Sequence, residues 1–420
     1  MKNRVLFCKV KAMEIKQKRL KYACYTTSAC MAIVCNLSPL LFLTFHSLYG
    51  ISYSLLGLLV LVNFVTQLSV DLAFSFFSHK FNIPKAVKFT PLLTAIGLVV
   101  YAASPWIMPN AVYLGLLIGT VIFSASSGFA EVLISPVIAA LPSKNPEREM
   151  SKLHSVYAWS TVAFVLFVTL FLFVFKSKNW AILPFILTVV PLIASLLFSG
   201  TAIPEMQTTE KASGAFEFLK DKRLLLSVLA IFLGGATECT MSQWCSGYLE
   251  QGLGVPKTIG DIFGVALFAL MLGLGRTIYA KSGKNIEKVL LLGSIGSVVC
   301  YFVASVAPFP FIGLIACATT GFCSSMLWPG NLIVAENRCP KTGVFLFAML
   351  AAGGDFGASV GPQLVGVLTD FAVANPTLIE FAQKLMLTPD QLGMKLGMLV
   401  GMIFPLLSVF VCMKFVKNEK

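Results

Sequence analysis

Twelve long apolar runs are the feature that most constrains the fold, because each is long enough to cross a lipid bilayer. A transmembrane helix needs roughly 20 mostly apolar residues. Apolar residues make up 57% of the 420 residues and charged residues only 12%, about half the charged share of a soluble protein. We therefore predict an all-α integral membrane protein with twelve transmembrane helices in two six-helix halves. The runs lie at 23–45, 51–77, 87–105, 112–140, 153–175, 180–202, 224–249, 260–280, 287–306, 311–335, 344–369 and 393–413.

Polar stretches between the runs indicate the domain boundaries. The most polar interior stretch follows the sixth run and carries four acids and four bases between Pro204 and Arg223. A second polar loop, at about 371–392, precedes the last run, and there Thr388 is expected to cap a short helix that begins at Pro389. The predicted domains are a basic cytoplasmic N-tail (1–22), an N-terminal six-helix bundle (23–203), a cytoplasmic linker (204–222), a C-terminal six-helix bundle (223–413) and a cytoplasmic C-tail (414–420).

The two predicted halves contain a short repeat in their fourth helices. Gly128 is followed eight residues later by Pro136, and Gly321 is followed eight residues later by Pro329. The offset of 193 residues is the spacing expected of two fused six-helix units. In transporters with such parallel repeats, the substrate site lies between the halves, near the middle of the membrane.

The basic residues predict the orientation of the chain. If both termini share one side, 27 of the 32 Lys and Arg residues fall on that side and five on the other. Cytoplasmic loops carry such an excess of positive charge, so we expect both termini in the cytoplasm and the chain in the cytoplasmic membrane. The net charge of +13 is then explained by topology, and the predicted partner is the bilayer rather than nucleic acid. We expect a monomer.

Four acidic residues lie inside apolar runs, where a charged group costs on the order of 3 kcal/mol. The sequence places no Lys or Arg at the same depth, and Arg276 is expected at the cytoplasmic end of its run. Acids of this kind can bind protons or a polar ligand; the structural alternative is a protonated acid hydrogen-bonded to a neighbouring helix. The proton-coupling candidates are Asp71, Glu131, Glu238 and Asp355.

Polar and aromatic side chains near these acids are candidates for binding a substrate. Asn63, Gln67 and Asp71 follow an i, i+4, i+8 spacing and therefore share one helix face. Amides, hydroxyls and indoles suit a polyol such as a sugar, although a nucleoside or an amino acid fits the same set, and a lone aromatic ring more often serves in packing than in ligand contact. The substrate-binding candidates are Asn63, Gln67, His154, Tyr157, Gln243, Trp244, Trp328 and Asn331.

The cysteines and the short motifs give no indication of a cofactor. Nine of the eleven cysteines lie in apolar runs and none forms a Cys-x-x-Cys pair, so we expect buried small side chains rather than metal ligands. The chain has no Walker A motif, no metal-ligand spacing and no nucleophile elbow. We therefore expect no cofactor, no metal and no enzymatic activity.

Several segments resemble the major facilitator superfamily and, within it, the fucose permease group of sugar:proton symporters. Residues 128–142 resemble that group's fourth helix, with Glu131 and Pro136 at matching places, and residues 234–249 resemble its seventh, with Glu238 and Trp244. The resemblance implies the twelve-helix major facilitator fold, alternating access to a central site, and sugar transport coupled to protons. The other segments that carry it are 267–276, 324–331 and 353–370.

The sequence departs from the family pattern at two places. His79, Lys80 and Asn82 stand where the superfamily carries Asp-Arg and then Gly between its second and third helices. Pro39 stands where the fucose permease group carries an Asp on its first helix. Asp71 is the candidate to replace that missing acid.

These observations predict a secondary transporter that moves a small polar, sugar-like solute together with protons. The alternative within transporters is a proton-coupled exporter of drugs or other amphipathic molecules, although several amides in the predicted interior favour a polar solute. Two other classes stay open: an integral membrane enzyme, which the motifs disfavour, and a receptor of the same fold that does not transport.

Overall fold

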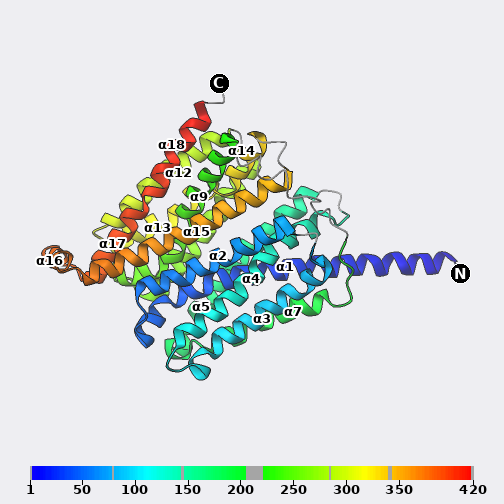
Figure 1. The fold of residues 1–420 in the computed structure, drawn as a ribbon, viewed down its shortest axis with the longest axis horizontal. Helices are drawn as coiled ribbons and strands as arrows, with labels where there is room; N and C mark the ends of the chain where they lie inside the picture. Colours follow the sequence, from blue (N-terminus) through cyan, green and yellow to red (C-terminus); the bar gives the residue numbers. More distant parts are fainter. Residues whose placement is uncertain are drawn as a thin grey trace. The chain divides into compact units, whose positions relative to one another are not determined.

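Every regular element of the described residues is a helix (Figure 1). The computed structural model describes residues 2–77, 80–142, 146–204, 221–282, 285–338 and 343–417. Eleven helical stretches in these residues are long and apolar enough to cross a membrane, and the shorter apolar stretch Ile182–Phe198 corresponds to the sixth predicted run. The twelve predicted runs are therefore confirmed as helices.

One compact unit contains Met1–Cys35, Ser69–Ser160 and Ala181–Glu210. Its helices pack around an apolar core that includes Phe74, Leu133 and Phe198. The first helix begins at Lys2, well before the predicted span at residue 23, so the described part of the predicted N-tail continues the helix. The unit's elements are the first part of α1 (Lys2–Tyr49), the end of α2 (Tyr53–Phe77), α3 (Ile83–Ile107), α4 (Val112–Ala139), the first half of α5 (Pro146–Phe175), α6 (Ile182–Leu187) and α7 (Val189–Phe198).

Close packing between α3 and α4 fixes the position of α4. Gly97 lies against Phe123, and a Cβ atom at Gly97 would come within 2.6 Å of the Phe123 backbone nitrogen. Further along the helices, Thr94 Oγ1 and Ser126 Oγ lie 2.6 Å apart, and Ser126 also donates to the Thr90 carbonyl. These contacts hold the segment of α4 that carries Glu131.

The other compact unit contains Asn36–Leu68, Thr161–Trp180 and Lys211–Lys420. It therefore joins parts of α1, α2 and α5, together with η2 (Ser177–Asn179), to the helices of the C-terminal half. These are α9 (Lys222–Gly247), η4 (Tyr248–Gly252), α10 (Lys257–Ile259), η5 (Gly260–Ala266), α11 (Leu267–Ser282), α12 (Ile286–Val306), α13 (Pro310–Ser324), α14 (Pro329–Arg338), α15 (Gly343–Ala374), α16 (Pro376–Lys384), α17 (Pro389–Gly401) and α18 (Ile403–Lys417).

The two repeat prolines have different effects on their helices. Pro136 lies inside α4, which continues to Ala139, whereas Pro329 begins α14 after a turn that interrupts the helix at 325–328. Proline cannot donate a backbone hydrogen bond, and it is tolerated best in the first turn of a helix. The turn places Trp328 directly before a helix start.

The predicted cap at the start of the last span is confirmed. Thr388 accepts a hydrogen bond from Gln391 N and the Gln391 side chain accepts from Thr388 N, which forms a capping box with Pro389 in the first turn. The prediction of a short helix here is wrong, because α17 runs to Gly401 and belongs to the last apolar stretch. The short helix of this loop is α16, which Asn375 caps.

Two other predictions have different outcomes. Of the nine cysteines whose side chains the structure describes, eight are buried and the ninth, Cys323, is half-buried, as expected of small apolar side chains. Most of the predicted linker 204–222 lies outside the described residues, as does His79. The course of the linker stays a prediction.

Candidate functional site

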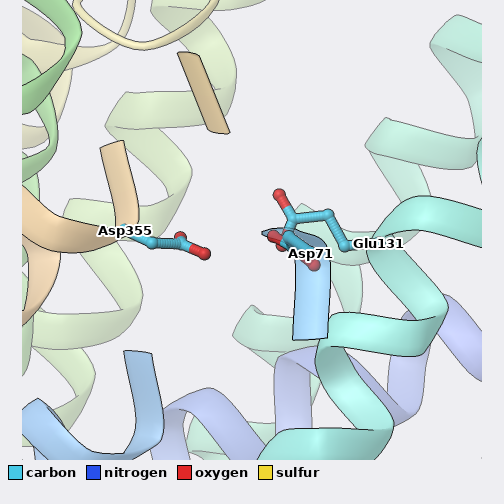
Figure 2. A group of neighbouring side chains, drawn as sticks. All are labelled: Asp71, Glu131 and Asp355. Atoms are coloured by element: carbon cyan, nitrogen blue, oxygen red, sulfur yellow. The ribbon is translucent and has the colours of Figure 1, made fainter. Parts of the chain in front are cut away.

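Asp71 and Glu131 bring two carboxyl groups together within the first unit (Figure 2). Asp71 lies near the C-terminal end of α2 and Glu131 lies on α4, and a carboxylate oxygen of one is within 4.8 Å of an oxygen of the other. Asp71 is only 1% exposed, and Glu131 is half-buried. Two acids that are sixty positions apart in the sequence therefore form one site.

Two negative charges this close repel each other strongly inside a membrane protein. At an effective dielectric constant of about 20, the repulsion at this distance is roughly 3 kcal/mol. No Lys, Arg or His among the described residues lies within ion-pair distance of Glu131. The arrangement therefore favours states in which the two acids share at least one proton.

The surroundings of the pair allow it to bind a proton or a small cation. Ser127 lies one turn before Glu131, and its buried hydroxyl forms no hydrogen bond within the described part of the chain. Carboxylate and hydroxyl oxygens are the ligands that hard cations prefer in proteins. A proton or a small cation bound by the acid pair would therefore neutralise part of its negative charge.

Glu238 has a basic partner, which corrects the expectation from the sequence. The guanidinium of Arg276 on α11 lies 3.4 Å from the Glu238 carboxylate on α9, and Arg276 Nε donates to the Ser325 carbonyl at 3.0 Å. Arg276 was expected at the cytoplasmic end of its run, out of reach. Its long side chain instead extends to an acid near the middle of α9, and this partner compensates the charge of Glu238.

Trp328 packs against α9, the helix that carries Glu238. Its indole packs on two glycines, and a Cβ atom would come within 3.1 Å of the ring at Gly235 and within 2.6 Å at Gly354. Gly235 lies one turn before Glu238 on α9, so the half-buried ring and the carboxylate lie on the same side of that helix. Asp355 follows Gly354 on α15 and is almost completely buried.

The predicted amide stripe on α2 is buried. Asn63 and Gln67 are both buried, and Gln67 Nε2 donates to the Asn63 carbonyl at 3.5 Å. Neither side chain belongs to the exposed apolar surface of the helices. Their contact with a substrate stays a prediction.

The structure gives other candidates different surroundings. Trp244 is fully buried, its Nε1 donates to the Pro362 carbonyl at 2.8 Å, and its ring packs on Phe42. Asn331 donates to the carbonyls of Ala230 and Leu327, which ties α14 to α9. These polar groups are therefore already used in packing the second unit.

For three further candidates, the role in binding a substrate stays a prediction. Gln243 is buried, and its Oε1 accepts no hydrogen bond from the described residues. Tyr157 is half-buried on α5. His154 belongs to the same helix, but its side chain lies outside what the structure describes.

A set of contacts that the sequence did not indicate connects α2 to the C-terminal half within the second unit. The carboxylate of Asp370, near the end of α15, accepts hydrogen bonds from Tyr53 N at 3.0 Å and Ser54 N at 2.7 Å. The Tyr53 hydroxyl donates to Asp390 at 2.9 Å. Asp370 therefore caps the first turn of a helix from the other sequence half, where the helix dipole favours a negative charge.

A second contact of this kind involves α5. Asp261 is completely buried, and it accepts hydrogen bonds from Thr169 on α5 and from Ser246, and lies 3.3 Å from Lys257 Nζ. The only sequence signal for these contacts was an acid at a helix end. Such acids are common, so the signal did not distinguish Asp370 and Asp261 from other acids.

Comparison with known proteins assigns the chain to a family. The sequence model described as Major Facilitator Superfamily matches residues 23–362. No curated protein sequence matches the chain significantly.

Solved structures of transporters have the same fold. A D-xylose-proton symporter aligns with a TM-score of 0.73 at 12% identity, over 92% of this chain and 96% of that one. The nucleoside transporter NupG aligns with a TM-score of 0.67 at 14% identity, over 96% and 99% of the two chains. The E. coli fucose:proton symporter FucP aligns with a TM-score of 0.60 at 14% identity, over 92% and 98%. At such identities these structures are evidence for the fold alone.

Proposed function

Because this chain belongs to the major facilitator superfamily, we propose that it carries a small polar, sugar-like solute across the cytoplasmic membrane together with protons. The observation that carries the proposal is the Asp71–Glu131 pair, in which two carboxyl groups within 4.8 Å of each other favour a shared proton. Sugar:proton and nucleoside transporters among the structural relatives support the solute class.

The acid pair supplies a way to couple proton movement to solute movement. When the site faces the side of higher proton concentration, the pair takes up a proton and loses the repulsion of about 3 kcal/mol. When it faces the other side, the proton leaves to water. The solute and the proton cross the membrane together because the same conformational change exposes both of their binding sites first to one side and then to the other.

The contacts around Asp370 and Asp261 support a cycle of alternating access. They join parts of α2 and α5 to the C-terminal half within one compact unit. Solute that enters between the two sequence halves must pass the end of the helices where Asp370 and Asp261 lie. For this to happen, these hydrogen bonds must break. Each is a polar contact that water can replace, so the cost of opening stays small.

In this proposal the solute is held by side chains from both halves. The buried amides of Asn63 and Gln67 bind hydroxyl groups from α2, and the Trp328 ring packs on the apolar face of a sugar. Gln243 is a further candidate for binding the solute, and Asp355 stays a candidate for proton coupling. From the excess of basic residues on one predicted side, we infer that both chain termini lie in the cytoplasm.

The test is uptake by purified protein in proteoliposomes. D-xylose, L-fucose, D-glucose and uridine serve as radiolabelled probes, each with and without an inwardly directed pH gradient. The proposal expects accumulation of a sugar above its external concentration only when the gradient is present. Uptake that is unchanged when an ionophore removes the gradient would overturn proton coupling, and accumulation of ethidium but of none of these probes would overturn the solute class.

A further inference from the structure

The Glu238–Arg276 pair has the features of a ligand-binding subsite rather than of a purely structural ion pair. The Arg276 side chain is 33% exposed and the Glu238 side chain 15% exposed, although both belong to helical stretches that cross the membrane. A structural pair in this environment is expected to be enclosed, because exposed charges in hydrocarbon are costly. The exposed part of the pair must therefore face something polar.

Arg276 does not face lipid. The exposed apolar side chains of α11 are Leu270, Leu274 and Ile278, which share one face at i, i+4 and i+8. At about 100° per residue, Arg276 is about 200° from its neighbours Leu274 and Ile278, on the opposite face of the helix. The guanidinium is thus directed into the protein, where it meets Glu238.

The pair keeps hydrogen-bonding capacity that the described residues do not use. Arg276 Nε donates to the Ser325 carbonyl and Nη2 approaches both Glu238 oxygens at 3.4 Å. This distance is longer than the usual 2.7–2.9 Å of a charge-assisted hydrogen bond. Nη1 donates to no acceptor among the described residues, and Glu238 accepts from no other donor there.

The surroundings of the pair provide an apolar surface and a further polar group. The half-buried Trp328 ring lies on Gly235, which is one turn from Glu238. Trp328 is also three positions after Ser325, whose carbonyl accepts a hydrogen bond from Arg276. Ser324 is fully buried, and its hydroxyl has no hydrogen-bond partner in the described part of the chain. A polyol presents both apolar C–H faces and hydroxyl groups that donate and accept, which matches this combination.

We propose that Arg276 and Glu238 form the hydroxyl-binding subsite of the C-terminal half, and that Glu238, by neutralising Arg276, makes the site selective for neutral sugars over sugar acids. The inference rests on the proposed function, because it takes the solute to be sugar-like. Arg276 donates to hydroxyl oxygens and Glu238 accepts from hydroxyl groups. Because the two charges cancel, a neutral solute leaves the site neutral, whereas a carboxylate has to compete with Glu238 for the guanidinium.

The selectivity follows from the charge of the subsite and should therefore change with it. Glu238→Gln leaves Arg276 without its counter-charge, so the subsite becomes positive and attracts a carboxylate. Arg276→Gln leaves Glu238 negative and repels one. The double variant Glu238→Gln/Arg276→Gln is neutral again and tests whether a variant has lost selectivity or merely its fold.

The experiment is equilibrium dialysis of the full-length purified protein against three matched pairs of probes. These are D-glucose and D-glucuronate, D-galactose and D-galacturonate, and D-mannose and D-mannuronate. The wild-type chain is expected to bind the neutral member of a pair more tightly than its acid. Arg276→Gln and Arg276→Lys should weaken binding of that sugar about tenfold or more, as expected when a hydrogen bond to a charged group is lost or misplaced. Glu238→Gln should shift the ratio of the two affinities toward the acid by at least tenfold.

Arg338→Gln is the matched control, because Arg338 also contacts an acid of the second unit, Glu287 at 3.9 Å, away from Trp328. It should leave all affinities unchanged. If the wild-type chain binds neither member of any pair, the sugar-like solute of the proposed function is wrong. If it binds a neutral sugar and the Arg276 and Glu238 variants bind both probes as the wild type does, only the subsite is wrong. A wild-type preference for the acid also overturns the subsite.

Discussion

Two pairs of ionisable groups, one in each unit, reduce the energetic cost of charge inside a membrane protein in opposite ways. In the first unit, Asp71 and Glu131 bring together two like charges, and in the second unit Glu238 meets the opposite charge of Arg276. The first pair lowers its energy by taking up a proton, whereas the second is already neutral. In the proposed function, the first pair couples transport to protons and the second binds the solute, although Asp71, Glu131 and Glu238 look alike in the sequence.

The largest expected effect is on proton-driven accumulation. Glu131→Gln mimics the protonated acid permanently and should abolish accumulation of the solute above its external concentration, while exchange of solute between the two sides continues. Glu238→Gln should keep accumulation coupled to the pH gradient, because the acid pair stays intact. Both are measured by uptake into proteoliposomes with a set pH gradient.

Glu380→Gln is the control for these two variants, since Glu380 is exposed on α16. Wild-type accumulation by Glu131→Gln would show that this acid is only a structural hydrogen-bonding group. Asp71 would then be the next candidate for the proton carrier.

The second prediction concerns stability. Arg276→Gln should lower the free energy of unfolding by about 2 kcal/mol, because it leaves Glu238 without its counter-charge inside the protein. Glu238→Gln/Arg276→Gln should recover most of this loss. Thermal unfolding in detergent, compared between the single and double variants, measures both effects.

The corresponding substitution in the acid pair should raise the stability of the protein rather than lower it. Asp71→Asn removes one of two like charges and should raise the midpoint of unfolding, with the larger increase at alkaline pH, where the shared proton is lost. A fall in the midpoint for Asp71→Asn, as large as that for Arg276→Gln, would mean that the two pairs are not electrostatic opposites.

Asp370 is an acid of another kind, because its carboxylate accepts hydrogen bonds from the backbone of α2. Asp370→Asn removes a charged cap and should weaken this contact by about 1 kcal/mol. The seam between α2 and α15, which is the surface along which these two helices pack, should then open more often. Gln363, which lies against Gly57 in this seam, can report the opening as Gln363→Cys.

Labelling of Gln363→Cys with a membrane-impermeant maleimide should be about fivefold faster when Asp370→Asn is added, the factor that corresponds to about 1 kcal/mol. Glu380→Gln, added in the same way, should leave the rate unchanged. An equal rate with and without Asp370→Asn would remove Asp370 from the closing contacts.

The smallest effect is expected at an acid that lies outside the membrane-spanning stretches. Hydrogen bonds from Lys21 and then Lys152 lower the pKa of Glu149 from its usual 4.5 to about 2. Because the folded-state pKa is lowered, the ion pairs stabilise the protein above pH 4.5, and this contribution is lost as the pH falls toward about 2. Glu149 stays ionised between about pH 5 and pH 8, where transport is assayed.

Glu149→Gln should therefore leave the pH profile of uptake unchanged and lower the unfolding midpoint only slightly, as is usual for partly exposed ion pairs. Uptake measured across this pH range for Glu149→Gln and Glu131→Gln gives the comparison. A shifted profile for Glu149→Gln would mean that proton coupling is not confined to the acid pair.

Sequence patterns were sufficient wherever a property depends on neighbours along the chain. The twelve apolar runs predicted the helices, because hydropathy over about 20 residues decides whether a segment can lie in a bilayer. The cap formed by Thr388 and the burial of the cysteines could be predicted for the same reason. The unusual cost of an acid in such a segment also identified Asp71, Glu131, Glu238 and Asp355 as residues that need a special environment.

What environment each acid receives was decided by the tertiary structure alone. Asp71 meets Glu131 because α2 and α4 pack around a common core, and Glu238 meets Arg276 because a long side chain on α11 turns inward rather than toward its helix end. Contacts between helices depend on the shapes of two packed surfaces, which hydropathy and spacing along one helix do not contain. The sequence by itself therefore determined that this chain spans a membrane and buries acids there, and packing decided which of those acids lies beside a second acid and which lies beside an arginine.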